Sequence, residues 1–154
     1  MSVDDNGLLT KAKVRPFTSV DELACICIIN EAMGQSFYWT KVESLDTQSF
    51  RATTSDEALI VAELAGQVVG FASIYIPDQF LHHLYVDPGF QRKGVGAALL
   101  SEMHSTIGSD ASLKCQVQNK TAREFYTANG WVEDSDIGGR DELGDWLWLR
   151  ITRD

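Results

Sequence analysis

The spacing of apolar and polar residues predicts two helices in the first third of the chain. Residues 19–22 match the capping box that opens a helix, and Gly34 suits a helix end. Between them, apolar residues follow the spacing of one buried helical face: Val20, Leu23, Ala24, Cys27 and Ile28. A second, short helix is expected around 43–51. Residues 1–13 are expected to form a loose arm or an edge segment ahead of a domain that spans 14–154.

The middle of the chain carries the shorter apolar runs of β-strands. Residues 58–64 and 67–76 are expected to pair as a hairpin across an Ala-Gly turn at 65–66. Residues 80–86 predict a third strand, which the Asp-Pro-Gly turn at 87–89 ends.

The second half alternates helices with strands. A helix is expected from 94 to about 107, with an apolar stripe formed by Gly96, Leu99, Leu100, Met103 and Ile107. A strand follows at 112–117, and then a short helix that Asn119 begins and Gly130 ends. Two closing strands are expected at 131–137 and 143–151. This order of elements predicts an α/β fold in which helices cover a mixed sheet.

Composition narrows the classes of function. The chain has 154 residues and a net charge of −9, which fits one soluble domain and argues against a nucleic-acid partner. We find no apolar run near the roughly 20 residues of a membrane span, and no secretory signal, so a cytoplasmic protein is expected. The three cysteines are expected to be small buried hydrophobic residues rather than redox or zinc residues.

A glycine-containing loop at 91–96 joins the strand at 80–86 to the helix that follows. The first turn of a helix has unpaired N–H groups and partial positive charge, so it binds anions. Gly94 and Gly96 remove side chains there, and Arg92 and Lys93 add positive charge. The loop therefore suggests a phosphate ligand, although glycines that serve only a tight turn are the alternative. It lacks the Lys-Ser/Thr of a Walker A loop and the third glycine of a dinucleotide-binding turn.

Two motifs together resemble the GCN5-related N-acetyltransferase (GNAT) family. The first, in LYVDPGFQRKGVGAALL, matches the family signature through Val86, Pro88, Gln91, Gly94 and Gly96. The second, in NKTAREFYTANGW, matches through Asn119, Ala122, Phe125, Tyr126 and Gly130, with Trp131 in place of the final phenylalanine. The resemblance implies a single-domain α/β fold with a mixed, mostly antiparallel central sheet flanked by helices. It also implies an acyltransferase that uses acetyl-CoA.

The resemblance further implies where acetyl-CoA binds. The pyrophosphate would be held by the N–H groups of 91–97, that is Gln91, Arg92, Lys93, Gly94, Val95, Gly96 and Ala97. The main chain of Leu84, Tyr85 and Val86 would pair with the pantetheine arm, which Asn119 would also contact. Val86 would supply the N–H that stabilises the thioester oxygen. A helix cap is the alternative role of Asn119.

The chemistry requires a base, because an alkylammonium with a pKa near ~10.4 is protonated at neutral pH. His82 matches the position at which some family members carry their base, and His83 is its rival. Adjacent strand residues point to opposite faces, so one of the two at most should be well aimed. Tyr126 matches the family's general acid, with core packing as the alternative. Tyr38 and Trp39 are candidate walls for the acceptor, and we expect no metal, because the three histidines are scattered.

We therefore expect an N-acetyltransferase that acts on a primary amine of a small molecule or peptide. A non-catalytic CoA-binding sensor or interaction module is the first alternative, and a pyrophosphate-binding protein for another nucleotide is the second. Acidic residues at 134–145 could attract a cationic amine or could simply form a solvated loop. The tryptophan-rich last strand could form the edge of a homodimer.

Overall fold

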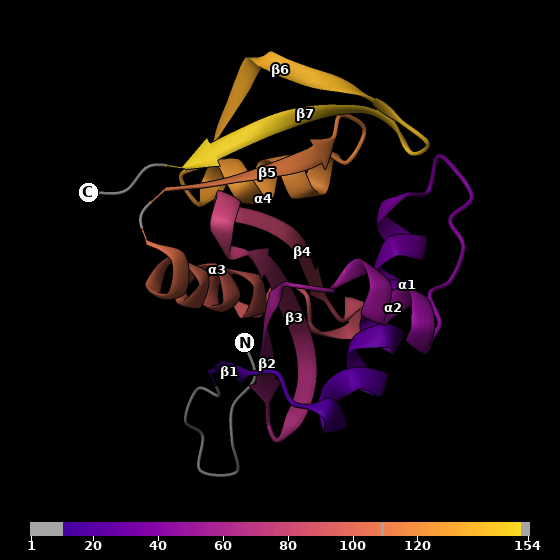
Figure 1. Cartoon of the computed structure of the whole chain (residues 1–154), viewed down its shortest axis with the longest axis vertical. Helices are drawn as coiled ribbons and strands as arrows, with labels where there is room; N and C mark the ends of the chain where they lie inside the picture. The colour runs from indigo at the N-terminus through magenta and orange to yellow at the C-terminus, as the bar shows by residue number, and fades with distance from the viewer. Residues whose placement is uncertain (1–10, 109, 152–154) are drawn as a thin grey trace.

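The computed structural model describes residues 11–108 and 110–151, whose strands form one seven-stranded sheet (Figure 1). The strands lie in the order β1-β2-β3-β4-β5-β7-β6. Their pairing is antiparallel except between β4 and β5, which run parallel. The strands are β1 (Lys13–Pro16), β2 (Ala58–Leu64), β3 (Gln67–Tyr75), β4 (Phe80–Val86), β5 (Ala111–Gln116), β6 (Val132–Asp141) and β7 (Gly144–Ile151).

Helices cover both faces of this sheet. They are α1 (Glu22–Ser36), α2 (Thr47–Thr53), α3 (Val95–Ile107) and α4 (Lys120–Ala128). In Figure 1, α1 and α2 lie together beside β3 and β4, while α3 lies on the other side and α4 lies along β5. Two buried clusters correspond to these layers. One joins α1 and α2 to Val61 and Phe71, and the other joins α3 and α4 to Ala62 and Ala72 of the same strands. The expected fold class is confirmed.

The strand predictions from alternation are close to the observed bounds. β2 and β4 cover the expected 58–64 and 80–86, and β3 ends one residue before the expected position. The turn between β2 and β3 holds Ala65 and Gly66 at φ angles of 53° and 79°. Both residues are left-handed, as in the type I′ turn that joins two-residue hairpins.

The predicted face of the first helix is largely wrong, because Ile28 alone of its five residues is buried and Cys27 is exposed. Val20 and Leu23 are 86% and 72% exposed, and the buried face is instead formed by Cys25, Ile26, Ile28, Ile29 and Ala32. The capping box also lies one residue earlier, between Thr18 and Asp21, and the helix continues past Gly34 to Ser36. The reason is that residues 23–29 are all apolar, so the local spacing fits more than one helical face, and packing against Val61 and Phe71 decides which face is buried.

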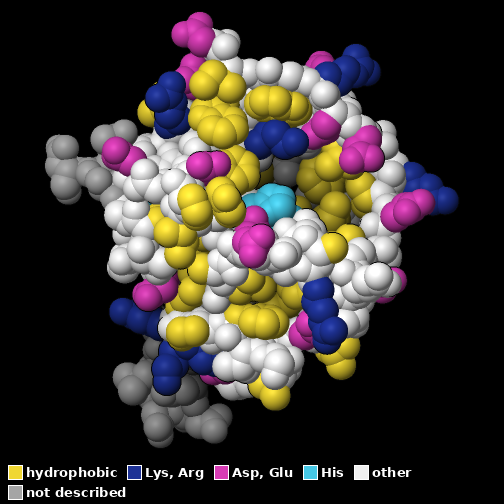
Figure 2. Space-filling view, in the orientation of Figure 1, with side chains coloured by type: hydrophobic (Ala, Val, Ile, Leu, Met, Phe, Trp, Pro, Cys, Tyr) yellow, Lys and Arg dark blue, Asp and Glu magenta, His cyan; other side chains and the backbone are white. Residues whose placement is uncertain are grey.

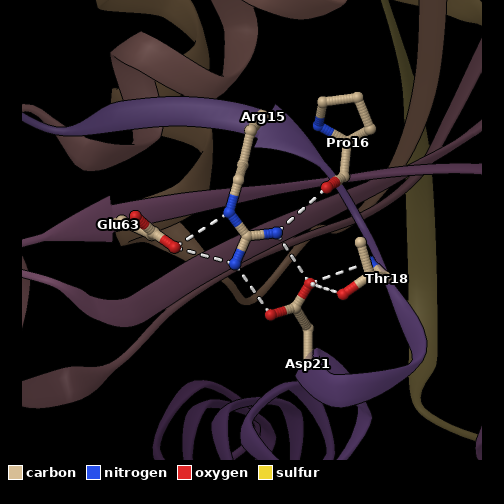
Figure 3. A network of polar contacts seen from close by, with 5 residues as sticks. All are labelled: Arg15, Pro16, Thr18, Asp21 and Glu63. Atoms are coloured by element: carbon tan, nitrogen blue, oxygen red, sulfur yellow. Dashed lines mark hydrogen bonds and ion pairs between the residues drawn. The ribbon is translucent and has the colours of Figure 1, made fainter.

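Arg15 ties the first strand to the start of α1 and to β2 (Figure 3). Its guanidinium donates to both carboxylate oxygens of Asp21 at 2.8 Å and to Glu63 at 2.8 Å. Asp21 is buried and also accepts the backbone N–H of Thr18. The hydrogen bonds from Arg15 lower the pKa of Asp21 to about 2. Lys13 already belongs to β1, so the expected arm overlaps an edge strand; residues 1–10 of the arm lie outside the described residues.

The last strand does not form an edge of the sheet. β7 lies between β5 and β6 and pairs with both, so β6 forms that edge. The suggestion that the tryptophan-rich strand offers a dimer edge is therefore wrong. Within the described ranges, no helix is long and apolar enough to cross a membrane.

Candidate active site

Strands β4 and β5 separate soon after they meet. Phe80 is registered with Ser112, and the Ser112 N–H donates to the carbonyl of Gln79 at 3.1 Å. In the described chain no further pair joins the two strands, and Figure 1 shows them diverging. A cavity of about 700 Å³ fills this opening, lined by residues 82–86 of β4 and 113–116 of β5. We call it the seam cavity.

Figure 2 shows histidine surface near the middle of one face of the molecule. A hollow lies beside it, bordered by hydrophobic and charged side chains. Both His82 and His83 belong to the lining of the seam cavity.

The main chain of β4 turns two N–H groups toward the seam cavity. Along an antiparallel strand, alternate residues direct their N–H groups to the same neighbour. The Asp87 N–H donates to the Val69 carbonyl at 2.8 Å, on the β3 side. The N–H groups of Leu84 and Val86 therefore point the other way, toward β5. These are the donors that the resemblance implies for the pantetheine arm and the thioester oxygen.

The start of α3 closes one end of the seam cavity. Its lining includes Gln91, Arg92, Gly94, Val95, Gly96 and Ala97. The first backbone bond of the helix runs from the Ala98 N–H to the Gly94 carbonyl at 3.0 Å. The N–H groups of the three preceding residues thus have no partner within the helix, and they carry its partial positive charge. Lys93 is the member of the expected phosphate loop that does not line the cavity.

The two glycines of this loop have different roles. Gly94 has a φ of 80°, a left-handed conformation that favours glycine, and a Cβ there would meet nothing within 4 Å. Gly96 has ordinary helical backbone, but a Cβ would lie 2.9 Å from the Phe125 ring. Gly96 therefore lets α3 pack closely on α4, a role that was not expected from the sequence.

Tyr126 reaches the seam cavity from α4. Asn119 caps this helix, because its Oδ1 accepts the Ala122 N–H at 3.2 Å, and Asn119 also lines the cavity. Tyr126 is buried and packs edge-on against Trp131. Burial raises the pKa of Tyr126 well above its usual value, with smaller contributions from Cys115 and Tyr85. The phenol therefore keeps its proton at neutral pH.

The two histidines lie side by side, contrary to the expectation that they face opposite ways. Ser73 pairs with His83 but Ile74 pairs with Leu81, so His82 is an extra residue in β4. Such a β-bulge interrupts the alternation of side chains. The two imidazole rings stack with centroids 3.9 Å apart.

The surroundings of the two imidazoles differ. His82 Nδ1 lies 2.7 Å from Glu57 Oε2, and its side chain is 37% exposed. His83 Nε2 lies 3.3 Å from the Thr53 hydroxyl. Burial, and to a smaller extent His82, lower the pKa of His83 to about 3. His83 is therefore neutral throughout the physiological range and is a weak base there.

Glu57 is the residue of this site that the sequence did not reveal. It stands in an acidic, polar turn before β2, where an exposed side chain would be expected. Glu57, His82 and His83 place their ligand atoms within 4.8 Å of one another, close enough that a metal ion could be considered. Because hydrogen bonds already engage the carboxylate and both rings, we describe them as a hydrogen-bonded cluster. The expectation of a metal-free enzyme stays a prediction.

The expected acceptor walls lie beside the cavity rather than in its lining. Tyr38 is 74% exposed, and its ring meets that of Trp39 edge-on. Trp39 donates its indole N–H to the Leu143 carbonyl at 2.7 Å, and Leu143 does line the cavity, as does Phe37.

The acidic residues at 134–145 are largely paired with cations. Asp134 pairs with Arg150, and Asp141 accepts from Lys114 at 2.8 Å. Asp141 lines the cavity, but its charge is compensated there. These contacts favour the interpretation that 134–145 is a solvated loop, because carboxylates that are already paired attract a cationic amine less strongly.

Comparisons with known proteins agree with this geometry. Residues 30–143 match the family model described as acetyltransferase (GNAT) domain. The uncharacterized N-acetyltransferase YhfO of Bacillus subtilis is 28% identical over an alignment of 97 residues, with 55% of this chain and 65% of that protein covered. The matched part of the chain thus spans about 65% of the length of this curated relative.

Two solved structures share the fold. A GCN5-related N-acetyltransferase from Rhodopseudomonas palustris aligns with a TM-score of 0.78 and 20% identity, over 95% of this chain and 98% of its own. The PaiA N-acetyltransferase from Thermoplasma acidophilum, solved in complex with coenzyme A, aligns with a TM-score of 0.75 and 18% identity, over 93% and 99% of the two chains. The family model matches more than half of the chain, so this chain belongs to the GNAT family of acetyltransferases.

Proposed function

We propose that the protein transfers the acetyl group of acetyl-CoA to a primary amine of a small molecule or peptide. The observation that carries this proposal is that one cavity is lined by residues 84–86 of β4, by Tyr126 and by His82. Each of the three has a distinct task in acyl transfer.

The donor would lie along the open edge of β4. The N–H groups at the start of α3, with Arg92 and Lys93 nearby, would hold its pyrophosphate. The main chain of 84–86 would pair with the pantetheine arm, and the side chain of Asn119 stands where it could contact the same arm. The coenzyme A found in PaiA, which shares this fold, supports that ligand.

Three groups would then carry the chemistry. When bound, acetyl-CoA supplies an acetyl group held as a thioester. The Val86 N–H would stabilise the negative charge that develops on the thioester oxygen. His82 would accept the proton that the amine must lose, and Tyr126 would donate its proton to the departing thiolate sulfur. The pKa of Tyr126 is raised by burial, so this residue is protonated and able to act as the acid.

The acceptor would approach from the side of α1 and the turn between β6 and β7. Phe37 and Leu143 line the cavity there, and the Trp39 indole N–H donates to the Leu143 carbonyl. We propose that Tyr38 and Trp39 flank this entrance. The mixed aromatic and polar wall suits the short apolar stem and amine of a small molecule or peptide terminus.

A thermal shift assay with acetyl-CoA, CoA, ATP and NAD in parallel tests the donor. A ligand at about 100 times its Kd stabilises a protein by roughly 2.7 kcal/mol, which shifts the Tm by several degrees. We expect acetyl-CoA and CoA alone to stabilise the protein. A shift with ATP or NAD of equal size, or no shift at all, would refute the proposal.

A thiol-release assay with a panel of amines tests the reaction. The expected result is amine-dependent release of CoA. Tight CoA binding without release by any amine would favour the alternative of a CoA-binding sensor.

A further inference from the structure

We infer that Glu57 is a positioning residue that holds His82 in the orientation and tautomer needed to accept the amine proton. The inference rests on the proposed function, in which His82 is the base. It adds a second residue, from a different part of the chain, to the catalytic machinery.

Glu57 is held in place by its own loop. It lies in the segment that joins α2 to β2, and its N–H donates to the Thr54 carbonyl at 3.1 Å. Thr54 in turn donates its hydroxyl to the Phe50 carbonyl at 2.9 Å, and Phe50 is buried in the core. The backbone that carries the Glu57 side chain is thus tied to the end of α2.

The Glu57 carboxylate is buried, whereas the His82 side chain is partly exposed. The Glu57 side chain is 7% exposed, whereas that of His82 is 37% exposed. A buried carboxylate is costly unless a donor satisfies it. The 2.7 Å contact with His82 Nδ1 supplies that donor, since Glu57 Oε1 has no hydrogen-bond partner within the described residues.

This contact selects the tautomer of His82. A carboxylate accepts hydrogen bonds, so Nδ1 must carry the proton, and Nε2 is left with its lone pair. The stacked ring of His83 and the Phe80 ring, 6.2 Å away between centroids, limit rotation of the imidazole. Two ionisable groups contact the His82 ring: Glu57, from the loop before β2, and His83, from β4.

The proton balance is simple. The proton leaves the amine nitrogen and binds His82 Nε2 as the nitrogen forms its bond to the thioester carbon. The carbon–sulfur bond then breaks, and the leaving thiolate takes the proton of Tyr126. Exchange through solvent returns a proton from the imidazolium to the Tyr126 phenolate. Glu57 stays ionised and faces the imidazolium that results, as in the carboxylate–histidine pairs of hydrolases. His82 touches the reacting amine, and Glu57 acts through His82.

A double-mutant cycle separates this role from a merely structural one. We expect Glu57→Gln to lower kcat by about tenfold to a hundredfold, part of the effect of losing a general base, while the KM for acetyl-CoA stays within about twofold. In a His82→Ala background, Glu57→Gln should cause no further loss, because both changes remove one function. Thr53→Val, which removes the contact to His83, is the matched control and should leave kcat within about twofold.

Wild-type kcat in Glu57→Gln, or effects of Glu57→Gln and His82→Ala that multiply, would overturn the inference. If His82→Ala keeps wild-type turnover, the base itself is wrongly assigned, and both claims fail. A loss in His82→Ala alone, with Glu57→Gln fully active, removes Glu57 and leaves the proposed function intact.

A measurement on the unmutated protein covers the case in which Glu57→Gln does not fold. The imidazole ¹⁵N shifts of the neutral His82 ring report which nitrogen holds the proton. We expect the Nδ1–H tautomer for His82. The Nε2–H tautomer, which is the commoner one in free histidine, would contradict the inference.

Discussion

The two edges of β4 offer the clearest contrast in the molecule. Toward β3, the strand is registered from Tyr75 and Phe80 at one end to Gly70 and Val86 at the other, with one bulge at His82. Toward β5, the registered pairing in the described chain is that of Phe80 with Ser112. One edge builds the sheet, and the other lines a cavity.

The contrast shows how a strand becomes a binding site without special side chains. Backbone N–H groups that have no neighbouring strand to pair with need another partner, because a buried unpaired donor is costly in free energy. On the open edge, those of Leu84 and Val86 face a cavity closed by the start of α3 and by α4. A ligand that runs along this edge would complete the pairing that β5 gives up.

The largest expected effect comes from removing the hydroxyl of Tyr126, the proposed general acid in the seam cavity. Tyr126→Phe keeps the ring that packs against Trp131 but removes the hydroxyl. Turnover should fall about a hundredfold, the usual contribution of a general acid, while affinity for acetyl-CoA and the Tm change little. Steady-state kinetics and titration of CoA measure both. Turnover equal to wild type would show that the acid is another group.

A pair of glycine variants tests the end of the cavity at α3. Gly94 and Gly66 both have φ near 80° and open space around them, but Gly66 lies in the hairpin turn between β2 and β3. Valine at either site should cost a similar ~1–2 kcal/mol of backbone strain. Gly94→Val should also weaken CoA binding at least tenfold, because a side chain then stands at the phosphate subsite. Equal CoA affinities in the two variants would refute that subsite.

Asp21, which does not line the seam cavity, should make the stability of the protein depend on acid instead of on ligands. The pKa of Asp21 is lowered from 3.8 to about 2, mainly by the hydrogen bonds of Arg15. Its stabilising contribution is therefore complete above about pH 4 and is lost as the pH falls toward 2. Because Arg15 is partly exposed, we expect a contribution on the order of 1 kcal/mol.

Denaturant unfolding at a series of pH values measures this contribution. Asp21→Asn should flatten the acid dependence between pH 4 and pH 2 and leave the kcat of the folded protein unchanged. An unaltered acid dependence would mean that other carboxylates control it.

The smallest effect is expected from a chelator. Side chains and backbone N–H groups carry every proposed step, so dialysis against EDTA should leave turnover within about twofold. A loss of turnover that Zn²⁺ restores would instead make Glu57, His82 and His83 a metal site.

Alternation and glycine spacing predicted the parts of the fold that depend on local pattern. β2 and β4 have the expected bounds because their apolar runs end at turn residues. Local pattern failed where neighbours decide the outcome. β1 has four residues and is defined by its pairing with β2, and the buried face of α1 is decided by its packing on the sheet, because residues 23–29 are all apolar.

The candidate site divides in the same way. Gly94, Gly96, Asn119 and Tyr126 are marked by motifs, and all of them line the cavity. The bulge at His82 depends on how β4 is registered with β3, which no pattern within 80–86 encodes. Glu57 is 25 residues from His82 in sequence, and only the folded loop brings its carboxylate to the imidazole.

Amide hydrogen exchange, resolved by residue with NMR, tests the central claim about the open edge of β4 most directly. Adding CoA should slow the exchange of the Leu84 and Val86 amides. The Asp87 amide, which already donates to Val69 across the paired edge, should change little. Exchange at Leu84 and Val86 that saturating CoA does not slow would contradict the account.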